Sequence, residues 1–149
     1  MKRLIKLLFS LIVLIGVVTS CQTVTPQEKE AQNSVLINKD GEYTSKEEVA
    51  LYLHTYSELP SNFITKEEAM ALGWNASKGN LHEVAPGKSI GGDRFMNREK
   101  LLPTDKSIQY FECDIDYKSG HRNGLRIVYS NQKDIYYSDD HYESFERLY

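Results

Sequence analysis

The order of two kinds of periodic pattern constrains the fold of this chain more than any other feature of its sequence. Helical patterns at residues 45–59 and 65–73 come first, and from Lys88 onward the pattern changes to short strands. Gly, Asn and Asp separate the aromatic and β-branched runs at spacings too short for crossover helices, which favours antiparallel pairing. Helices followed by strands predict an α+β domain, with the helices packed on one face of a twisted antiparallel sheet.

Each predicted helix begins with a capping box, in which Ser or Thr is followed three residues later by Glu. The first box is Ser45-Lys46-Glu47-Glu48 and the second is Thr65-Lys66-Glu67-Glu68. Apolar positions recur at helical spacing after the first box, at Val49, Tyr52, Leu53 and Tyr56. Gly73 is a natural stop for the second, shorter helix.

The run from Ile108 to Tyr117 alternates between apolar and polar residues, as a strand with two different faces does. One face carries Phe111, Cys113, Ile115 and Tyr117, and the other carries Tyr110, Glu112, Asp114 and Asp116. We expect the first face to pack against the helices, with Cys113 as a small core residue. The second face is expected to stay open, with Glu112 and Arg126 on it.

The first twenty residues have the layout of a secretory signal peptide, since Lys and Arg precede an apolar run from Leu7 to Val18. That run is shorter than the roughly 20 apolar residues that cross a bilayer. The segment Val18-Thr19-Ser20-Cys21 resembles a bacterial lipobox, which implies cleavage before Cys21 and a lipid on its sulfur. An ordinary signal peptide with a chance cysteine is the alternative.

This N-terminal pattern divides the chain into a signal peptide at 1–20, a flexible tether at 21–39 and one domain at 40–149. The tether is rich in Gln, Thr, Glu, Asn and Ser, which is typical of a solvated linker. An exported protein is therefore expected, held at the membrane through Cys21 or extracellular. If Cys21 carries lipid, Cys113 has no intramolecular partner and no disulfide is predicted.

The charge balance restricts how such a chain could bind nucleic acid. The sequence has 18 basic and 21 acidic residues, and loss of residues 1–20 removes three basic ones, leaving 15 against 21 and a formal net charge of −6. Phosphate binders normally gain affinity and association rate from a positive field. Any nucleic-acid site here must therefore be a local basic cluster within an acidic surface.

Few patterns of catalytic chemistry are present. No His, Cys and Asp cluster has metal-ligand spacing, no glycine-rich loop opens a helix, and no Ser occupies a nucleophile elbow, so neither metal nor cofactor is expected. What remains is Glu112, the pair Arg122 and Arg126, and the late polar segment with His141. A base, an acid and cations are what a metal-free phosphodiester transesterification requires. Charged residues on an open sheet face, however, usually only meet solvent.

A series of ungapped runs in the last hundred residues carries a more specific signal. They are Leu59-Pro60, Ile64-Thr65-Lys66, Ala71-Leu72-Gly73-Trp74, Ala76-Ser77-Lys78-Gly79-Asn80-Leu81, Val84-Ala85-Pro86-Gly87-Lys88-Ser89-Ile90-Gly91-Gly92-Asp93, Asn97-Arg98-Glu99, Ser119-Gly120, Arg122-Asn123 and Asp140-His141-Tyr142. From about Ala50 to Tyr149 the chain thus resembles the barnase and binase group of guanyl-preferring bacterial ribonucleases. The resemblance implies the microbial ribonuclease fold.

The resemblance also implies catalytic roles. Glu112 falls at the general base of the family and His141 at its general acid, while Arg126, Arg122 and Lys66 match its phosphate-binding cations. Other interpretations remain for single residues. Glu112 could form a surface salt bridge with Arg126, His141 could be merely exposed, and Lys66 could be an ordinary lysine at a helix start.

Guanine recognition is implied for a loop and two aromatic rings. The matching positions are Phe95, Asn97, Arg98, Glu99 and Tyr142. In the family the glutamate accepts hydrogen bonds from guanine N1–H and N2–H, and the rings stack on the base. Pairing of Glu99 with Arg98 is the alternative. The chain departs from its better-known relatives in having Met96 at a position for a small serine, and in its acidic charge.

The function implied is an endoribonuclease that cleaves single-stranded RNA after guanosine. The first product would be a 2′,3′-cyclic phosphate, which the enzyme then hydrolyses, and a monomer is expected. The family is commonly paired with a small acidic inhibitor of the barstar type, so such a partner is implied too. A non-catalytic module that binds RNA or an inhibitor on the same fold, and an intercellular ribonuclease toxin, are the alternatives.

Overall fold

Both predicted helices begin at their predicted caps in the computed structural model, which describes residues 36–149. Helix α1 is Lys46–Tyr56, and the Ser45 side chain at its N-cap accepts the backbone N–H of Glu48. Helix α2 is Lys66–Ala71, and its capping box between Thr65 and Glu68 is complete. The chain leaves α2 through Gly73 at φ +99°, a left-handed conformation that favours glycine. The two helix predictions are confirmed.

The predicted signal peptide at 1–20, the lipidation site Cys21 and most of the tether lie outside the described residues. The last residues assigned to the tether are bonded to α1, because the hydroxyl of Tyr52 donates to the Lys39 carbonyl at 2.7 Å and that of Tyr56 to the Ile37 carbonyl at 3.0 Å. Across residues 36–149, every helix is too short or too polar to cross a lipid bilayer.

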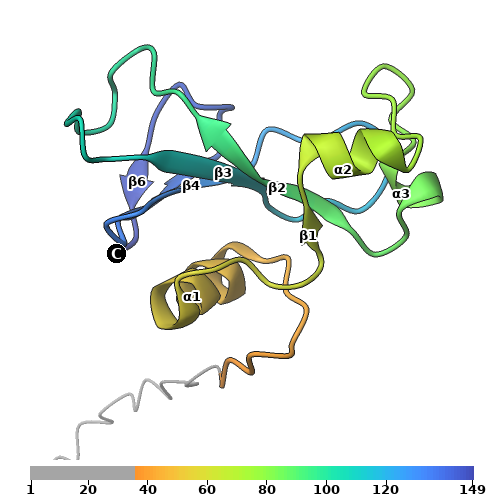
Figure 1. Ribbon diagram of the computed structural model, residues 1–149, viewed down its shortest axis with the longest axis horizontal. Helices are drawn as coiled ribbons and strands as arrows, with labels where there is room; N and C mark the ends of the chain where they lie inside the picture. Colours follow the sequence, from red (N-terminus) through yellow and green to blue (C-terminus); the bar gives the residue numbers. More distant parts are fainter. Residues whose placement is uncertain (1–35) are drawn as a thin grey trace, which may run out of the picture. The chain divides into compact units, whose positions relative to one another are not determined.

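The strands form one six-stranded sheet in which each strand lies beside its neighbours in the sequence (Figure 1). They are β1 Phe63–Ile64, β2 Ser89–Phe95, β3 Tyr110–Asp114, β4 Arg126–Ser130, β5 Ile135–Ser138 and β6 Glu146–Arg147. All pairs from β2 to β6 are antiparallel, which confirms the predicted α+β class. Strand β1 pairs with β2 in parallel and was not predicted, because two residues show no alternation. The four-residue helix α3, Leu81–Val84, was also missed.

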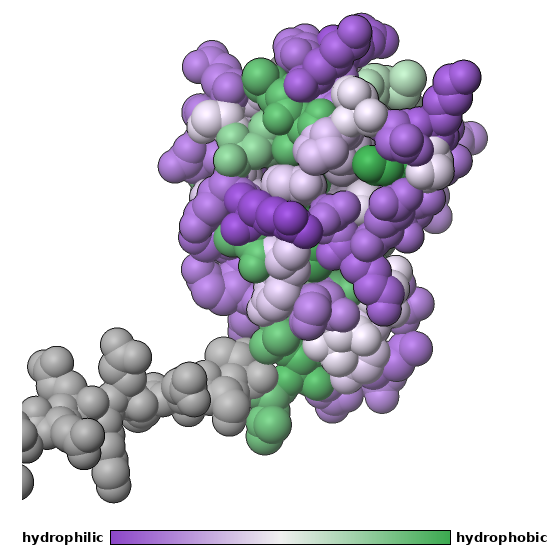
Figure 2. All heavy atoms as spheres, turned by 90° about the vertical axis from the view of Figure 1, so that its left-hand side faces the viewer, coloured by the Kyte–Doolittle hydropathy of each residue, from purple (hydrophilic) through white to green (hydrophobic). Residues whose placement is uncertain are grey.

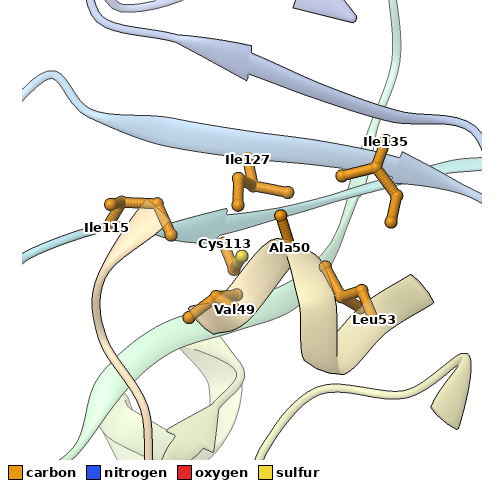
Figure 3. Close-up of a cluster of buried hydrophobic side chains, with 7 residues drawn as sticks. All are labelled: Val49, Ala50, Leu53, Cys113, Ile115, Ile127 and Ile135. Carbon is orange, nitrogen blue, oxygen red and sulfur yellow. The ribbon is translucent and has the colours of Figure 1, made fainter. Parts of the chain in front are cut away.

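Helix α1 covers one face of the sheet (Figure 3). The buried cluster between them comprises Val49, Ala50, Leu53, Cys113, Ile115, Ile127 and Ile135. The predicted alternation is therefore correct on this face, and Cys113 is a fully buried core residue. Complete burial of an aliphatic side chain stabilises a fold by about 1.5 to 3 kcal/mol. This cluster therefore holds β3 and β4 against α1.

The opposite face of the sheet is covered, and here the prediction of an open face is wrong. Its buried residues are Leu102, Tyr110, Val128 and Tyr136, against which Phe95, Ile108, Tyr142 and Phe145 are packed. Only 6% of Glu112 and 2% of Arg126 remain exposed. Alternation within a strand defines its two faces, but it does not reveal that segments distant in the sequence return to cover one of them.

A third cluster joins α2 and α3 to β2. It comprises Ala69, Trp74, Leu81, Ala85, Ile90 and Tyr117. The first residue of α2, Lys66, is held beside the sheet by a hydrogen bond of 3.0 Å from its backbone N–H to Asp93 Oδ2. This packing brings the start of α2 next to the polar residues of β3.

Candidate active site

Glu112 lies at the centre of a polar cluster on the covered face of the sheet. Its two carboxylate oxygens accept hydrogen bonds from the Lys66 ammonium and the Tyr142 hydroxyl. Burial acts to raise the pKa of Glu112, but the hydrogen bonds from Lys66 and Tyr142 and the charges of Lys66 and Arg122 outweigh it and hold the pKa below its ordinary value. The carboxylate is therefore ionised at neutral pH. The salt bridge with Arg126 that was the alternative for Glu112 is not formed, because Arg126 pairs elsewhere.

A β-bulge helps to bring Lys66 to Glu112. In the pairing of β2 with β3, the register shifts between Gly91 and Asp93, and Asp93 then lies opposite Glu112. Gly92, in the bulge, has φ +95°, which favours glycine. Asp93 binds the N-terminus of α2, as described above, so one short segment of β2 positions both the helix and its first side chain.

Two arginines share one buried carboxylate beside Glu112. Asp114 accepts two hydrogen bonds of 2.6 Å from Arg122, and Arg126 Nε lies 3.2 Å from Asp114 Oδ1. Asp114 and Arg126 are direct partners in the β3–β4 register. Burial acts to lower the pKa of Arg122, but the bonds and charge of Asp114 outweigh it and raise the pKa. Asp114 thus holds both guanidinium groups in place beside Glu112.

Arg126 is almost fully buried, which is stable only because its donors are paired. Besides Asp114 it bonds to the Leu125 carbonyl at 2.8 Å, to Asn123 Oδ1 at 3.3 Å and to the Tyr142 hydroxyl at 3.1 Å. Within residues 36–149 no buried side-chain polar atom is left without a partner. The cation therefore has one orientation before any substrate binds.

Tyr142 connects the carboxylate with this cation. Its hydroxyl donates to Glu112 and accepts from Arg126, and burial followed by the bond to Glu112 raises its pKa. The centre of its ring lies 5.0 Å from that of Phe95. The sequence predicted a stacking role for the ring, whereas its hydroxyl bonds could not be foreseen from the motif.

His141 lies next to this network on an exposed turn. The residue has φ +58°, and its backbone N–H donates to the Gly124 carbonyl at 3.2 Å. The centre of its imidazole ring is 4.9 Å from that of Tyr142. The ring forms no hydrogen bond to any other residue of the described chain, so its nitrogens can meet a substrate.

Asp140 organises the turn that carries His141 and Tyr142. It accepts four hydrogen bonds, from the hydroxyls of Ser138 and Ser144 at 2.8 and 2.6 Å and from the backbone N–H groups of Glu143 and Ser144 at 3.0 Å. The bonds from Ser144 are the main cause that lowers the pKa of Asp140 to about 2. The turn therefore keeps its conformation across the whole neutral range of pH.

We expect Asp140→Ala to lower kcat by about 10-fold to 100-fold, because the resemblance assigns His141 a catalytic role and displacing such a group by about 1 Å costs up to this much. Steady-state kinetics would measure the loss. Asp139→Ala is the matched control, since Asp139 is an exposed neighbour outside these hydrogen bonds. Equal kcat values for the two variants would contradict the positioning role of Asp140.

The loop after β2 carries the residues predicted to recognise guanine. Asn97 has φ +45°, and its side-chain amide donates to the Leu102 carbonyl at 2.9 Å and accepts the Leu102 N–H at 3.1 Å. Asn97 therefore shapes the loop itself. Arg98 and Glu99 are exposed, and in the part of the chain that the structure describes they form no ion pair with each other. Met96 is 61% exposed.

The structure thus brings most predicted site residues together, and it adds others that sequence reasoning missed. Asp114 was placed on the same face as Glu112 but received no role, although its position two residues along the strand was a usable signal. Asp93 and Asp140 gave no signal beyond lying in the runs that carry the resemblance. No three His, Cys, Asp or Glu side chains of residues 36–149 are grouped as a metal site requires.

Comparison with known proteins gives consistent matches. A family model described as ribonuclease matches residues 46–149. The chain is 58% identical over 100 residues to proteins named Ribonuclease from Heyndrickxia coagulans, Bacillus intermedius and Bacillus pumilus. The aligned part is 67% of this chain, 92% of the first relative and 62% of each of the other two.

Proposed function

Because this chain belongs to the ribonuclease family and is an RNA-cleaving enzyme, we propose that it cuts single-stranded RNA after guanosine by transesterification and then hydrolysis. One observation supports this most: an ionised, buried carboxylate, Glu112, lies beside three cationic side chains, with an imidazole at the edge of the cluster. Such a set offers a base, an acid and charge stabilisation.

In the first step Glu112 takes the proton of the ribose 2′-hydroxyl while that oxygen attacks phosphorus. The bond from O2′ to phosphorus forms, the bond from phosphorus to the leaving O5′ breaks, and His141 gives its proton to O5′. A 2′,3′-cyclic phosphate results. In the second step the roles reverse. His141 takes a proton from water as the water oxygen bonds to phosphorus, the bond from phosphorus to O2′ breaks, and Glu112 returns a proton to O2′, which leaves the 3′-phosphate.

Lys66, Arg122 and Arg126 are assigned to the non-bridging oxygens, where charge develops in the transition state. The two arginines are already oriented by Asp114, so little reorganisation is needed. Lys66 is bonded to Glu112 in the absence of substrate. A bound phosphate competes for Lys66, which weakens the contact that lowers the pKa of Glu112 and makes the carboxylate a stronger base.

The guanine site is assigned to the loop after β2. The exposed carboxylate of Glu99 accepts N1–H and N2–H of guanine, Phe95 and Tyr142 stack on the base, and Arg98 lies at the edge of the site. Asn97 contributes by holding the loop in shape. Adenine has no N1–H donor, so it would leave an acceptor unpaired.

Glu99→Gln tests this assignment. The unpaired acceptor costs about 1 to 3 kcal/mol, which corresponds to a factor of about 5 to 150, and the ratio of kcat/KM for GpN over ApN is expected to fall by that factor. Glu58→Gln, at an exposed carboxylate on another part of the chain, is the control. A ratio unchanged by Glu99→Gln would remove Glu99 from the guanine site.

The proposed function also includes a membrane anchor and an inhibitor protein. We propose that the chain is exported and anchored by a lipid on Cys21. Fatty-acid labelling of the full chain tests this, with Cys21→Ala as the control. An unlabelled full chain would refute the anchor.

We further propose that a small acidic inhibitor of the barstar type binds the cations of the site and blocks them. The test is whether such a protein inhibits cleavage of GpN, and no inhibition would refute the proposal.

A further inference from the structure

A hollow lies on the face of the sheet that packs on α1, at the C-terminal end of that helix. It has a volume of about 250 Å³, and we call it the α1 hollow. Its lining comprises Leu53, Ser57, Phe111, Tyr129, Ser130, Asn131, Lys133 and Ile135. Phe111 precedes Glu112 on β3, and successive side chains of a strand point to opposite faces. The sheet itself therefore separates the α1 hollow from the candidate active site.

The turn between β4 and β5 forms one wall of the α1 hollow and lies beside the C-terminus, at the left of Figure 1. Figure 2, which views the left-hand side of Figure 1, shows a largely hydrophilic face with small apolar patches. The lining of the α1 hollow differs from such a face because most of its floor is apolar.

The floor consists of aliphatic and aromatic side chains. Leu53 and Ile135 belong to the buried cluster between α1 and the sheet, and the ring of Phe111 stacks on that of Tyr129 with 5.7 Å between their centres. Burial raises the pKa of Tyr129, so its hydroxyl stays neutral at physiological pH. An apolar floor with a few polar groups at its rim is typical of sites for small molecules.

Hydrogen bonds fix the polar wall of the hollow. The Asn131 side chain accepts the Gln109 N–H at 2.9 Å and donates to the Ser107 carbonyl at 3.0 Å. The Ser130 hydroxyl accepts two backbone N–H groups of the turn between β4 and β5, each at 3.1 Å. The wall is thus formed before a ligand arrives, and a preformed site pays less for ordering when it binds.

Lys133 gives the hollow a positive charge. It is the one cation of the lining, which contains no acidic residue. The carboxylate of the adjacent Asp134 is paired with Arg147 at 2.6 Å, and within residues 36–149 Lys133 takes part in no salt bridge. Its ammonium group is therefore available to an external anion.

The backbone of Lys133 is in a conformation that lysine rarely adopts. Its φ is +72°, and its N–H donates to the Ser130 carbonyl at 3.1 Å within the turn. Glycine or asparagine would fit this left-handed conformation at a lower cost in stability. Residues held in such conformations cluster at ligand sites, where their side chains have a role.

A neighbouring hollow of about 420 Å³ determines where a bound anion would lie. It shares three lining residues with the α1 hollow, but the carboxylates of Glu58 and Glu68 also line it. These carboxylates disfavour an anion on their side. An anionic group in the α1 hollow is therefore directed towards Lys133.

We propose that the α1 hollow binds a small aromatic acid, with its single ring on the apolar floor and its carboxylate on the Lys133 ammonium. The volume sets the size of the ligand. An apolar cavity of about 150 Å³ holds benzene, whereas sites for drug-sized molecules begin at about 300 Å³. A hollow of about 250 Å³ thus fits one ring that carries a carboxylate. This inference does not depend on the proposed function.

The test compares three probes: phenylacetate, phenylacetamide, which has the same ring without the charge, and acetate, which has the charge without the ring. Amide chemical shifts of the isotope-labelled full chain give both the site and the Kd. We expect phenylacetate to shift the amides of Leu53, Tyr129 and Ile135 with a Kd of about 1 mM, given its roughly ten non-hydrogen atoms. Phenylacetamide should bind about threefold to fivefold more weakly, because it lacks the ion pair, and acetate should not bind.

Lys133→Asn should weaken phenylacetate binding by about threefold to fivefold and leave the Kd of phenylacetamide unchanged. Its melting temperature should not fall, because asparagine adopts the left-handed conformation more readily than lysine. Lys118→Asn is the matched control, since it removes the same charge at an exposed lysine outside the hollow. Both ring probes should bind this control as they bind wild type.

Several results would overturn the proposal. Phenylacetate could fail to bind or could shift amides away from the α1 hollow, or phenylacetamide or acetate could bind as tightly as phenylacetate. An equal loss of both ring probes in Lys133→Asn would show that the hollow had changed shape and that no ion pair had been lost. An equal loss of phenylacetate in Lys118→Asn would show that the contribution of Lys133 is not local.

Discussion

His141→Ala and Glu112→Gln should each lower kcat by about 10²-fold to 10⁴-fold, the contribution of a general acid or base. His141 makes its ring available beside Tyr142 without a bond to the rest of the described chain, so its removal changes chemistry more than stability. Gln replaces the Glu112 carboxylate at constant size, which keeps a partner for Lys66 and Tyr142. Single-turnover kinetics with a GpN substrate would measure both losses.

His54→Ala provides the control for the histidine, because His54 lies on α1 and stacks on Tyr149, on the other side of the sheet from Glu112. Turnover close to that of wild type in His141→Ala or in Glu112→Gln would show that the residue in question is not the acid or the base. A melting temperature near that of wild type for each variant would show that the loss of kcat comes from the chemistry and not from unfolding.

The second large effect is expected at Asp114, which is 1% exposed and pairs with both arginines. Asp114→Asn removes the charge that compensates Arg126 and Arg122 and should lower the free energy of unfolding by about 3 to 5 kcal/mol. It should also lower kcat, since the two cations lose their orientation. Urea unfolding measures the first effect and steady-state kinetics the second.

Asp139→Asn is the control, since this aspartate is exposed and forms no ion pair within the described chain. Because domains of this size are stable by only about 5 to 15 kcal/mol, a variant of Asp114 that fails to fold also agrees with the prediction. A loss below about 1 kcal/mol, the range of exposed pairs, would show that the arginines do not depend on Asp114.

The local parts of the fold could be predicted because their causes are local. The caps at Ser45 and Thr65 fix the helix starts, and the alternation around Cys113 fixes the face that packs on α1. The burial of Glu112 could not be predicted, since it depends on the turn around Tyr142 folding back over the sheet. Propensity and alternation contain no information about such distant contacts.

The candidate site likewise has parts that the sequence could predict and parts that it could not. The polar face of β3 pointed to Glu112 and the polar residues near the C-terminus to His141, but their roles came from the resemblance to a family. The pairing of Asp114 with Arg126 required the register of β3 and β4, which the sequence leaves undetermined by one or more residues. The hydroxyl of Tyr142 bonds to Glu112 on β3 and to Arg126 on β4. Because these bonds join three separate segments of the chain, no pattern within a single segment could reveal them.

The order of products from GpN in the presence of EDTA tests the proposed chemistry most directly. Phosphorus NMR of the reaction of the full chain follows every phosphate species at once. We predict that guanosine 2′,3′-cyclic phosphate accumulates first and is then converted to the 3′-phosphate, with EDTA leaving the rate unchanged. A 5′-phosphate product, a 3′-phosphate formed without the cyclic species, or loss of activity in EDTA would contradict transesterification by Glu112 and His141.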